Sequence, residues 1–160
     1  MLKTVGVTAL IIAVVAVLAV TGRKSVHAEA FIAVPPNVVW ETVTDASSYP
    51  AWNPILVKAD GVFEQGSTMR YQMKIGDADP TPVAPVIKQL VVNELLHQGG
   101  GMTGVLTYDH QWRFEPVTGG TKVVQHEVYT GFGVWFWDPS GVEQQYQNGL
   151  EALMELLENG

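Results

Sequence analysis

The stretch MTGVLTYDHQWRFEPVTGGTKVVQHEVYTGF, residues 102–132, decides the fold because it reads as two long strands joined by a tight turn. Its first part alternates polar and apolar side chains, and its second part is rich in β-branched residues. Gly119-Gly120 between them is typical of a hairpin turn. One face of the first strand collects Tyr108, His110, Trp112 and Phe114. We therefore expect an antiparallel strand pair with an aromatic face toward the interior.

Further strand-like segments precede this pair and a helix follows it. Residues 25–34, 55–64, 68–75 and 86–96 have strand character and are bounded by turn residues. Gly99-Gly100-Gly101 after the fourth of them is typical of a turn or bulge. After the last strand, Asp138-Pro139 is typical of a helix N-terminus, and the helix that follows repeats apolar residues at three- and four-residue steps. Strands followed by one long terminal helix form an α+β pattern, in which an antiparallel sheet buries its inner face against that helix.

Two groups of residues carry a resemblance to a known family. The first comprises NVVWETVTD, residues 37–45, and YPAWNP, residues 49–54. The second comprises YDHQWRFEP, residues 108–116, and HEVYTG, residues 126–131. Together they resemble the START/Bet v 1-like superfamily (SRPBCC), particularly its bacterial polyketide cyclase/dehydrase-like members. The resemblance implies a helix-grip fold, with a curved antiparallel sheet around a long C-terminal helix and a hydrophobic cavity for lipids, sterols, polyketides or other apolar molecules.

The N-terminal segment differs from the rest of the chain. It is almost uninterruptedly apolar from Val5 to Val20, and at about 1.5 Å per residue a helix of this length just spans a hydrocarbon core of roughly 30 Å. A cleaved signal segment is the alternative, but cleavage after Ala28 would cut the first strand. We expect one N-terminal transmembrane helix, residues 1–22, followed by the ligand-binding domain, residues 23–160.

The side of the membrane stays open, and with it the localisation beyond a single-pass N-terminal anchor. Lys3 precedes the apolar run and Arg23 and Lys24 follow it, so the positive-inside rule gives nearly a tie.

His110 and Glu127 are the candidate catalytic residues. A neutral histidine beside a buried apolar ligand acts as an acid or base near pH 7, or hydrogen-bonds a ligand carbonyl. Glu127 lies on the neighbouring strand, where it could orient the imidazole, although the pattern leaves open which face of that strand points inward. The alternative is a partly buried structural histidine and a structural carboxylate.

The predicted ligand-binding residues are mostly aromatic side chains on the strands and in the corner: Trp52, Tyr71, Met73, Tyr108, His110, Trp112 and Tyr129. A second aromatic group, Trp135-Phe136-Trp137, precedes the last helix. Three consecutive bulky aromatics cannot all face one core, so we expect at least one to be exposed at a cavity mouth, a lipid surface or a partner protein.

Composition excludes several functions. The net charge of −7 and only nine Lys and Arg residues argue against a nucleic-acid partner. The chain has no cysteine, which excludes disulfides and thiolate chemistry. Its four histidines are scattered, so we predict no metal site and no cofactor.

Three functions fit these observations. The first is membrane-tethered binding of a hydrophobic small molecule, lipid-like or polyketide-like, in a cavity between the sheet and the C-terminal helix. The second is a cyclase- or dehydratase-type enzyme that uses His110 as general acid/base. The third is an accessory subunit of a membrane protein complex, docked through the N-terminal helix and the aromatic group.

Overall fold

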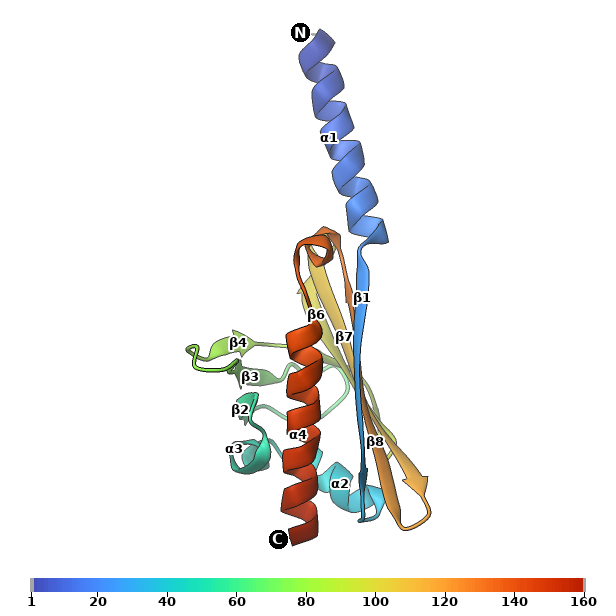
Figure 1. The fold of residues 1–160 in the computed structure, drawn as a ribbon, viewed down its shortest axis with the longest axis vertical. Coiled ribbons are helices and arrows are strands. Elements are labelled where there is room, and N and C mark those ends of the chain that lie inside the picture. The colour runs from blue at the N-terminus through green and yellow to red at the C-terminus, as the bar shows by residue number, and fades with distance from the viewer. Residues whose placement is uncertain (1, 160) are drawn as a thin grey trace.

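The structure, a computed structural model, describes residues 2–159, with side chains described from residue 5 onward. Two antiparallel sheets and a long C-terminal helix form the domain, and one further helix extends away from it (Figure 1). The helices are α1 (Leu2–Thr21), α2 (Pro36–Val43), α3 (Tyr49–Trp52) and α4 (Ser140–Asn159), with the 3-10 helices η1 (Ala46–Ser48) and η2 (Phe132–Phe136). The strands are β1 (Arg23–Ile32), β2 (Leu56–Asp60), β3 (Arg70–Met73), β4 (Thr81–Val83), β5 (Val86–Val91), β6 (Leu95–Met102), β7 (Leu106–Val117) and β8 (Gly120–Thr130).

The predicted strand pair is the centre of the larger sheet, whose order is β1-β8-β7-β6-β5. β7 and β8 form a hairpin whose register places His110 opposite Glu127. The prediction that Trp112 and Phe114 face the interior is confirmed, because each is only 2% exposed. Side chains of a strand alternate between its two faces, so this register also decides which residues of β8 point inward.

The smaller sheet, β2-β3-β4, closes one side of the fold. Residues just before β3 bridge it to the larger sheet: Thr68 pairs with Val86, and the Met69 N–H donates to the Pro85 carbonyl at 3.0 Å. The single curved sheet expected from the family resemblance is therefore two sheets joined at one bridge. Together, the two sheets enclose the interior of the domain on two sides.

The C-terminal helix α4 packs on the inner face of the larger sheet (Figure 1). The Asp138 carboxylate accepts a bond of 3.1 Å from the Ser140 N–H at its start, as the cap pattern predicts. Leu150 and Leu153 are fully buried in the core. This α+β arrangement, an antiparallel sheet with a C-terminal helix across it, fits the helix-grip fold.

One segment differs from the sequence expectation. The sequence predicts one strand over residues 86–96 and a turn or bulge at Gly99 to Gly101, but the chain turns earlier, where Asn93 has a φ of 64°. The glycines belong to β6 instead. A Cβ on Gly100 would lie 2.7 Å from the Tyr108 hydroxyl, so the tyrosine ring occupies the space that a side chain would need.

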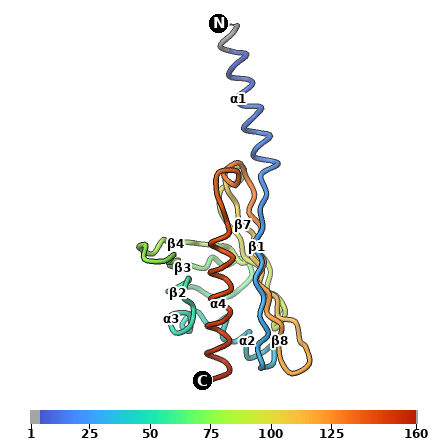
Figure 2. The backbone as a smooth tube through the Cα atoms, viewed as in Figure 1, coloured from blue at the N-terminus to red at the C-terminus, as the bar shows by residue number. Residues whose placement is uncertain are grey.

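Helix α1 extends beyond the domain, and the two ends of the chain lie at opposite ends of the molecule (Figure 2). Within the described part of the chain, no helix combines the length and the apolar content that a membrane crossing requires. The transmembrane anchor predicted for residues 1–22 is therefore not supported. The side chain of Lys3, used in the prediction of orientation, lies outside the described residues.

Candidate ligand cavity

A cavity of about 280 Å³ lies between the inner face of the larger sheet, the smaller sheet and the N-terminal half of α4. Most of its wall is apolar or aromatic. A few polar side chains interrupt it, among them Gln98, Gln125 and Glu127, each less than 5% exposed. The more exposed lining residues, Ile75 and Leu106, mark its mouth between the β3–β4 loop and the start of β7.

Glu127 is the buried carboxylate of this wall. The sequence left open which face of β8 points inward. In the structure, Glu127 points inward and His126 lies on the outer face. The Tyr129 hydroxyl donates to Glu127 Oε2 at 2.5 Å, and the Tyr146 hydroxyl donates to the same oxygen. Two neutral donors therefore hold one carboxylate oxygen inside an aromatic environment.

The tyrosines around Glu127 are hard to ionise. Burial, reinforced by the negative charge of Glu127, raises the pKa of Tyr108 to about 12. The same two causes raise the pKa values of Tyr129 and Tyr146 further. All three phenols stay protonated and keep their donor hydrogens at neutral pH.

His110 lies directly opposite Glu127 and its ring stacks on Tyr146, with centroids 4.9 Å apart and planes 6° from parallel. Burial lowers its pKa, and the nearby charge of Glu127 only partly opposes this shift. The imidazole is therefore neutral near pH 7. Its Nε2 atom is covered and has no hydrogen-bond partner among the described residues.

The opposite wall is held by polar contacts of its own. The Tyr71 hydroxyl donates to Gln98 Oε1 at 3.0 Å, which links β3 to β6 across the cavity edge. In the corner after α3, Asn53 Oδ1 accepts from the N–H groups of Ile55 and Leu56 at 2.9 and 2.7 Å. These bonds satisfy buried polar groups and position the smaller sheet.

The structure places the predicted ligand-binding residues as follows. Six of them line the cavity: Tyr71, Met73, Tyr108, His110, Trp112 and Tyr129. Trp52 does not. It is 5% exposed, its Nε1 donates to Ser48 Oγ, and its ring meets Trp112 edge-on in the core beside the cavity.

Sequence reasoning missed Tyr146, Gln125 and Trp137, which also line the cavity. Gln125 could have been found from its alternation with Glu127 once the inward face of β8 was known. Tyr146 lies on α4, but no local pattern in the sequence pairs its hydroxyl with Glu127.

The aromatic group before α4 divides as expected. Trp135 and Phe136 are 53% and 77% exposed, and Trp137 turns inward against Tyr129, with ring centroids 4.6 Å apart. Trp135 Nε1 also donates to the Leu18 carbonyl of α1 at 3.1 Å. The exposed pair therefore lies beside the root of α1.

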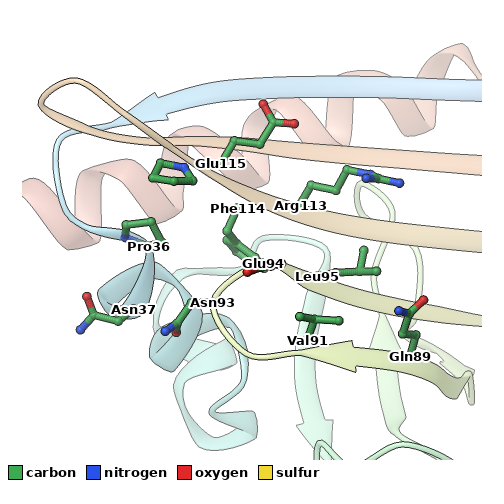
Figure 3. Close-up of a pocket in the computed structure, with 11 residues that line it drawn as sticks. Pro36, Asn37, Gln89, Val91, Asn93, Glu94, Leu95, Arg113, Phe114 and Glu115 are labelled. Carbon is green, nitrogen blue, oxygen red and sulfur yellow. The ribbon is translucent and has the colours of Figure 1, made fainter.

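Two wider hollows lie outside this cavity. One, of about 650 Å³, lies near the start of α2 and the β5–β6 turn and is bordered by exposed polar side chains such as Asn37 and Arg113 (Figure 3). The other, of about 820 Å³, lies on the outer face of the larger sheet, where Asp109 binds Lys88 and His97 at 2.6 Å each. Neither encloses buried, unpartnered polar groups among the described residues. Among the described residues, no group of acidic residues and histidines could hold a metal ion.

The comparison with known families identifies the class of protein. The family model described as polyketide cyclase / dehydrase and lipid transport matches residues 23–158. The chain belongs to this family, within the SRPBCC superfamily. No curated protein matches it.

Solved structures share the fold at low sequence identity. A protein from Rhizobium leguminosarum is 20% identical, with a TM-score of 0.68, and the match covers 86% of this chain and 96% of that one. The di-domain ARO/CYC BexL from the BE-7585A biosynthetic pathway is 12% identical, with a TM-score of 0.71, over 86% of this chain and 50% of that one. Ara h 8.0201 is 16% identical, with a TM-score of 0.67, over 87% and 100%. At these identities the likeness concerns the fold alone.

Proposed function

We propose that the protein binds a hydrophobic small molecule, lipid-like or polyketide-like, in the cavity between the sheets and α4. The observation that carries this proposal is an apolar cavity with a few buried polar groups, the composition typical of small-molecule sites. Its volume of about 280 Å³ is close to the lower end of ligand pockets, about 300 Å³. The ligand is therefore compact.

The test is native mass spectrometry of the full chain extracted in mild detergent, with the small molecules that co-purify identified. Gly149 lines the cavity, and a Cβ there would meet its nearest neighbour, Ile55 Cδ1, at 3.9 Å. We expect a bound molecule in the wild type and its loss in G149F, where the ring fills the cavity. G141F is the matched control, because Gly141 lies on α4 with no atom within 4 Å of its Cβ position. Equal ligand occupancy in all three proteins would contradict the proposal.

A second candidate is a cyclase- or dehydratase-type enzyme. The neutral, buried His110 favours it, since its Nε2 has no hydrogen-bond partner among the described residues and keeps its capacity for acid–base chemistry. H110Q separates the two functions. If the protein is an enzyme, H110Q abolishes conversion of the co-purifying molecule but leaves its binding largely intact. An unchanged turnover in H110Q excludes His110 as the acid or base.

We further propose that α1 holds the domain at a membrane. Apolar side chains cover α1 and are 45–83% exposed: Val5, Val7, Leu10, Ile11, Ile12, Val14, Val15, Val17 and Val20. Exposed apolar residues continue around its root, in an apolar rim formed by Met102, Val105, Leu106, Trp135 and Phe136. Exposed apolar surface of this extent is typical of a lipid or protein contact.

The basic residues after α1 and the position of the cavity mouth also support a membrane at this end of the domain. Arg23, which is exposed, and Lys24, whose Nζ donates to the Trp137 carbonyl, follow α1 after Gly22, in a chain whose net charge is −7. Basic residues beside an apolar helix attract anionic lipid. Leu106 belongs both to the apolar rim and to the mouth of the cavity, so a bilayer at the rim lies beside the ligand entrance.

Single-cysteine labelling tests the tether, because the chain has no native cysteine. F136C and V92C each carry one environment-sensitive fluorophore, and the full-length proteins are mixed with vesicles containing one-quarter anionic lipid and a nitroxide-labelled lipid. Val92 is 66% exposed in the β5–β6 turn, at the far end of β6 from the rim. We expect quenching at F136C and none at V92C. Absence of quenching at both sites excludes the tether.

A further inference from the structure

The lining of the cavity is unbalanced in charge. None of its twenty-one residues is Lys or Arg, and Glu127 is its one acidic member. No ion pair involves Glu127 among the described residues, in contrast to Glu29 and Asp109 on the outer face, which bind lysines. A buried carboxylate ordinarily has a cation beside it, because burying an uncompensated charge is costly.

His110 does not supply that cation. It is the titratable neighbour directly opposite Glu127 in the register, yet burial keeps the pKa of its imidazole below the ordinary value even with the carboxylate nearby. Among the described residues, the side chains that hydrogen-bond to Glu127 are Tyr129 and Tyr146, whose hydroxyls donate but carry no charge. The carboxylate is therefore solvated by neutral donors and left without a counter-charge.

The surroundings of Glu127 suit a positive charge. Aromatic side chains form the wall on both sides of it, including Tyr108, Tyr129 and Tyr146, with Trp137 packed against Tyr129. The faces of aromatic rings attract cations, more strongly when the cation is shielded from water. An ammonium group here would meet both the carboxylate and the rings.

We propose that the ligand is an apolar amine in its protonated form, with Glu127 as the partner of its ammonium group. This inference rests on the proposed function, because it concerns the occupant of the same cavity. It also predicts rejection of carboxylates such as free fatty acids. An anionic group would find no cation in the wall and would face Glu127.

The test uses three probes of matched size and different charge: 1-naphthylmethylamine, 1-naphthylmethanol and 1-naphthoate. Binding to the full chain in mild-detergent micelles is measured by calorimetry at pH 7, with empty micelles as the blank. We expect the amine to bind about tenfold or more tightly than the alcohol, the value of a charge-assisted hydrogen bond, and the carboxylate to bind most weakly.

Two substitutions complete the experiment. E127Q keeps the shape and an acceptor oxygen but removes the charge, so the amine and the alcohol should bind E127Q with similar affinities. E29Q, on the exposed outer face, is the matched control and should keep the wild-type order. Circular dichroism verifies that both variants are folded.

The outcomes separate this inference from the proposed function. If the alcohol or the carboxylate binds as tightly as the amine and G149F abolishes that binding, the cavity is a ligand site and the amine inference is wrong. The inference is also wrong if E127Q preserves the preference for the amine. If no probe shows binding that G149F removes, the proposed function fails, and the amine inference fails with it.

Discussion

At the residue scale, the Glu127 cluster links the stability of the fold to the cavity. Tyr129 and Tyr146 come from β8 and α4, and both donate to the same carboxylate oxygen. A buried carboxylate stays favourable only while such donors compensate for the water it has lost. The cluster therefore joins the helix to the sheet through hydrogen bonds in an otherwise apolar region.

Removing either hydroxyl tests this role. We expect Y129F and Y146F each to lower the free energy of unfolding by about 1–3 kcal/mol, because each leaves the buried carboxylate with one donor fewer. Urea unfolding measures the change. Y108F is the matched control, since the Tyr108 hydroxyl makes no side-chain hydrogen bond in the described structure, and a loss in Y108F as large as in the other two would argue against the cluster.

The buried His110 predicts a pH dependence of stability. Its folded pKa is lowered, so between the ordinary value of about 6.5 and that lowered pKa the unfolded chain binds a proton that the folded protein does not. The free energy of unfolding should therefore fall as the pH drops below about 6.5. Urea unfolding between pH 7.5 and 5.5 should show a flatter dependence of the free energy of unfolding on pH in H110Q than in the wild type. An unchanged slope in H110Q would show that other groups cause it.

At the element scale, two glycines with opposite surroundings show what α4 and β6 require. On α4, the Cβ of an alanine at Gly149 would have its nearest neighbour at 3.9 Å. On β6, a Cβ at Gly100 would lie 2.7 Å from the Tyr108 hydroxyl and 2.9 Å from its Cζ. One site has room for a methyl group, and the other holds a ring of the cavity wall.

The two alanine variants should change the free energy of unfolding in opposite directions. G149A raises the free energy of unfolding by about 0.5–1 kcal/mol, because alanine is the better helix residue. G100A lowers it by about 1–3 kcal/mol, because the Tyr108 ring must move within a packed wall. Thermal and urea unfolding measure both changes, and a destabilised G149A would mean that α4 packs more tightly on the sheet than the structure indicates.

At the scale of the whole molecule, the apolar side chains of α1 and of the apolar rim are exposed, in contrast to those in the interior of the domain. The domain buries its apolar side chains in two clusters between sheet and helix, whereas the described apolar side chains of α1 have no such cover. Exposed apolar surface of this extent favours association in water.

We therefore expect the full chain to self-associate in aqueous buffer and to become monomeric when detergent is added, as measured by size-exclusion chromatography with light scattering. The double variant L10K/I11K places two charges on α1 and should reduce the association without changing the domain. V92K is the control at the far end of the sheet. A monomeric wild type in detergent-free buffer would contradict the prediction.

Local sequence patterns were sufficient to predict the strand β7 and the helix α4. The alternation around Trp112 predicted the strand and its inward face, and the cap at Asp138 predicted the last helix, because both depend on neighbours in the chain. The same logic failed at Gly99 to Gly101. Their place in β6 depends on the Tyr108 ring of the next strand, which local composition does not contain.

The sequence by itself thus determined the α+β class, the inward aromatic face of β7 and the family, since periodicity and motifs are properties of the chain. Tertiary structure alone decided that Glu127 points into the cavity, that Tyr146 reaches it from α4, and that Trp52 belongs to the core. The physical reason is that strand register and helix docking bring together residues distant in sequence. That the cavity wall contains Glu127 but no Lys or Arg follows only from the tertiary structure, which decides which residues line the cavity.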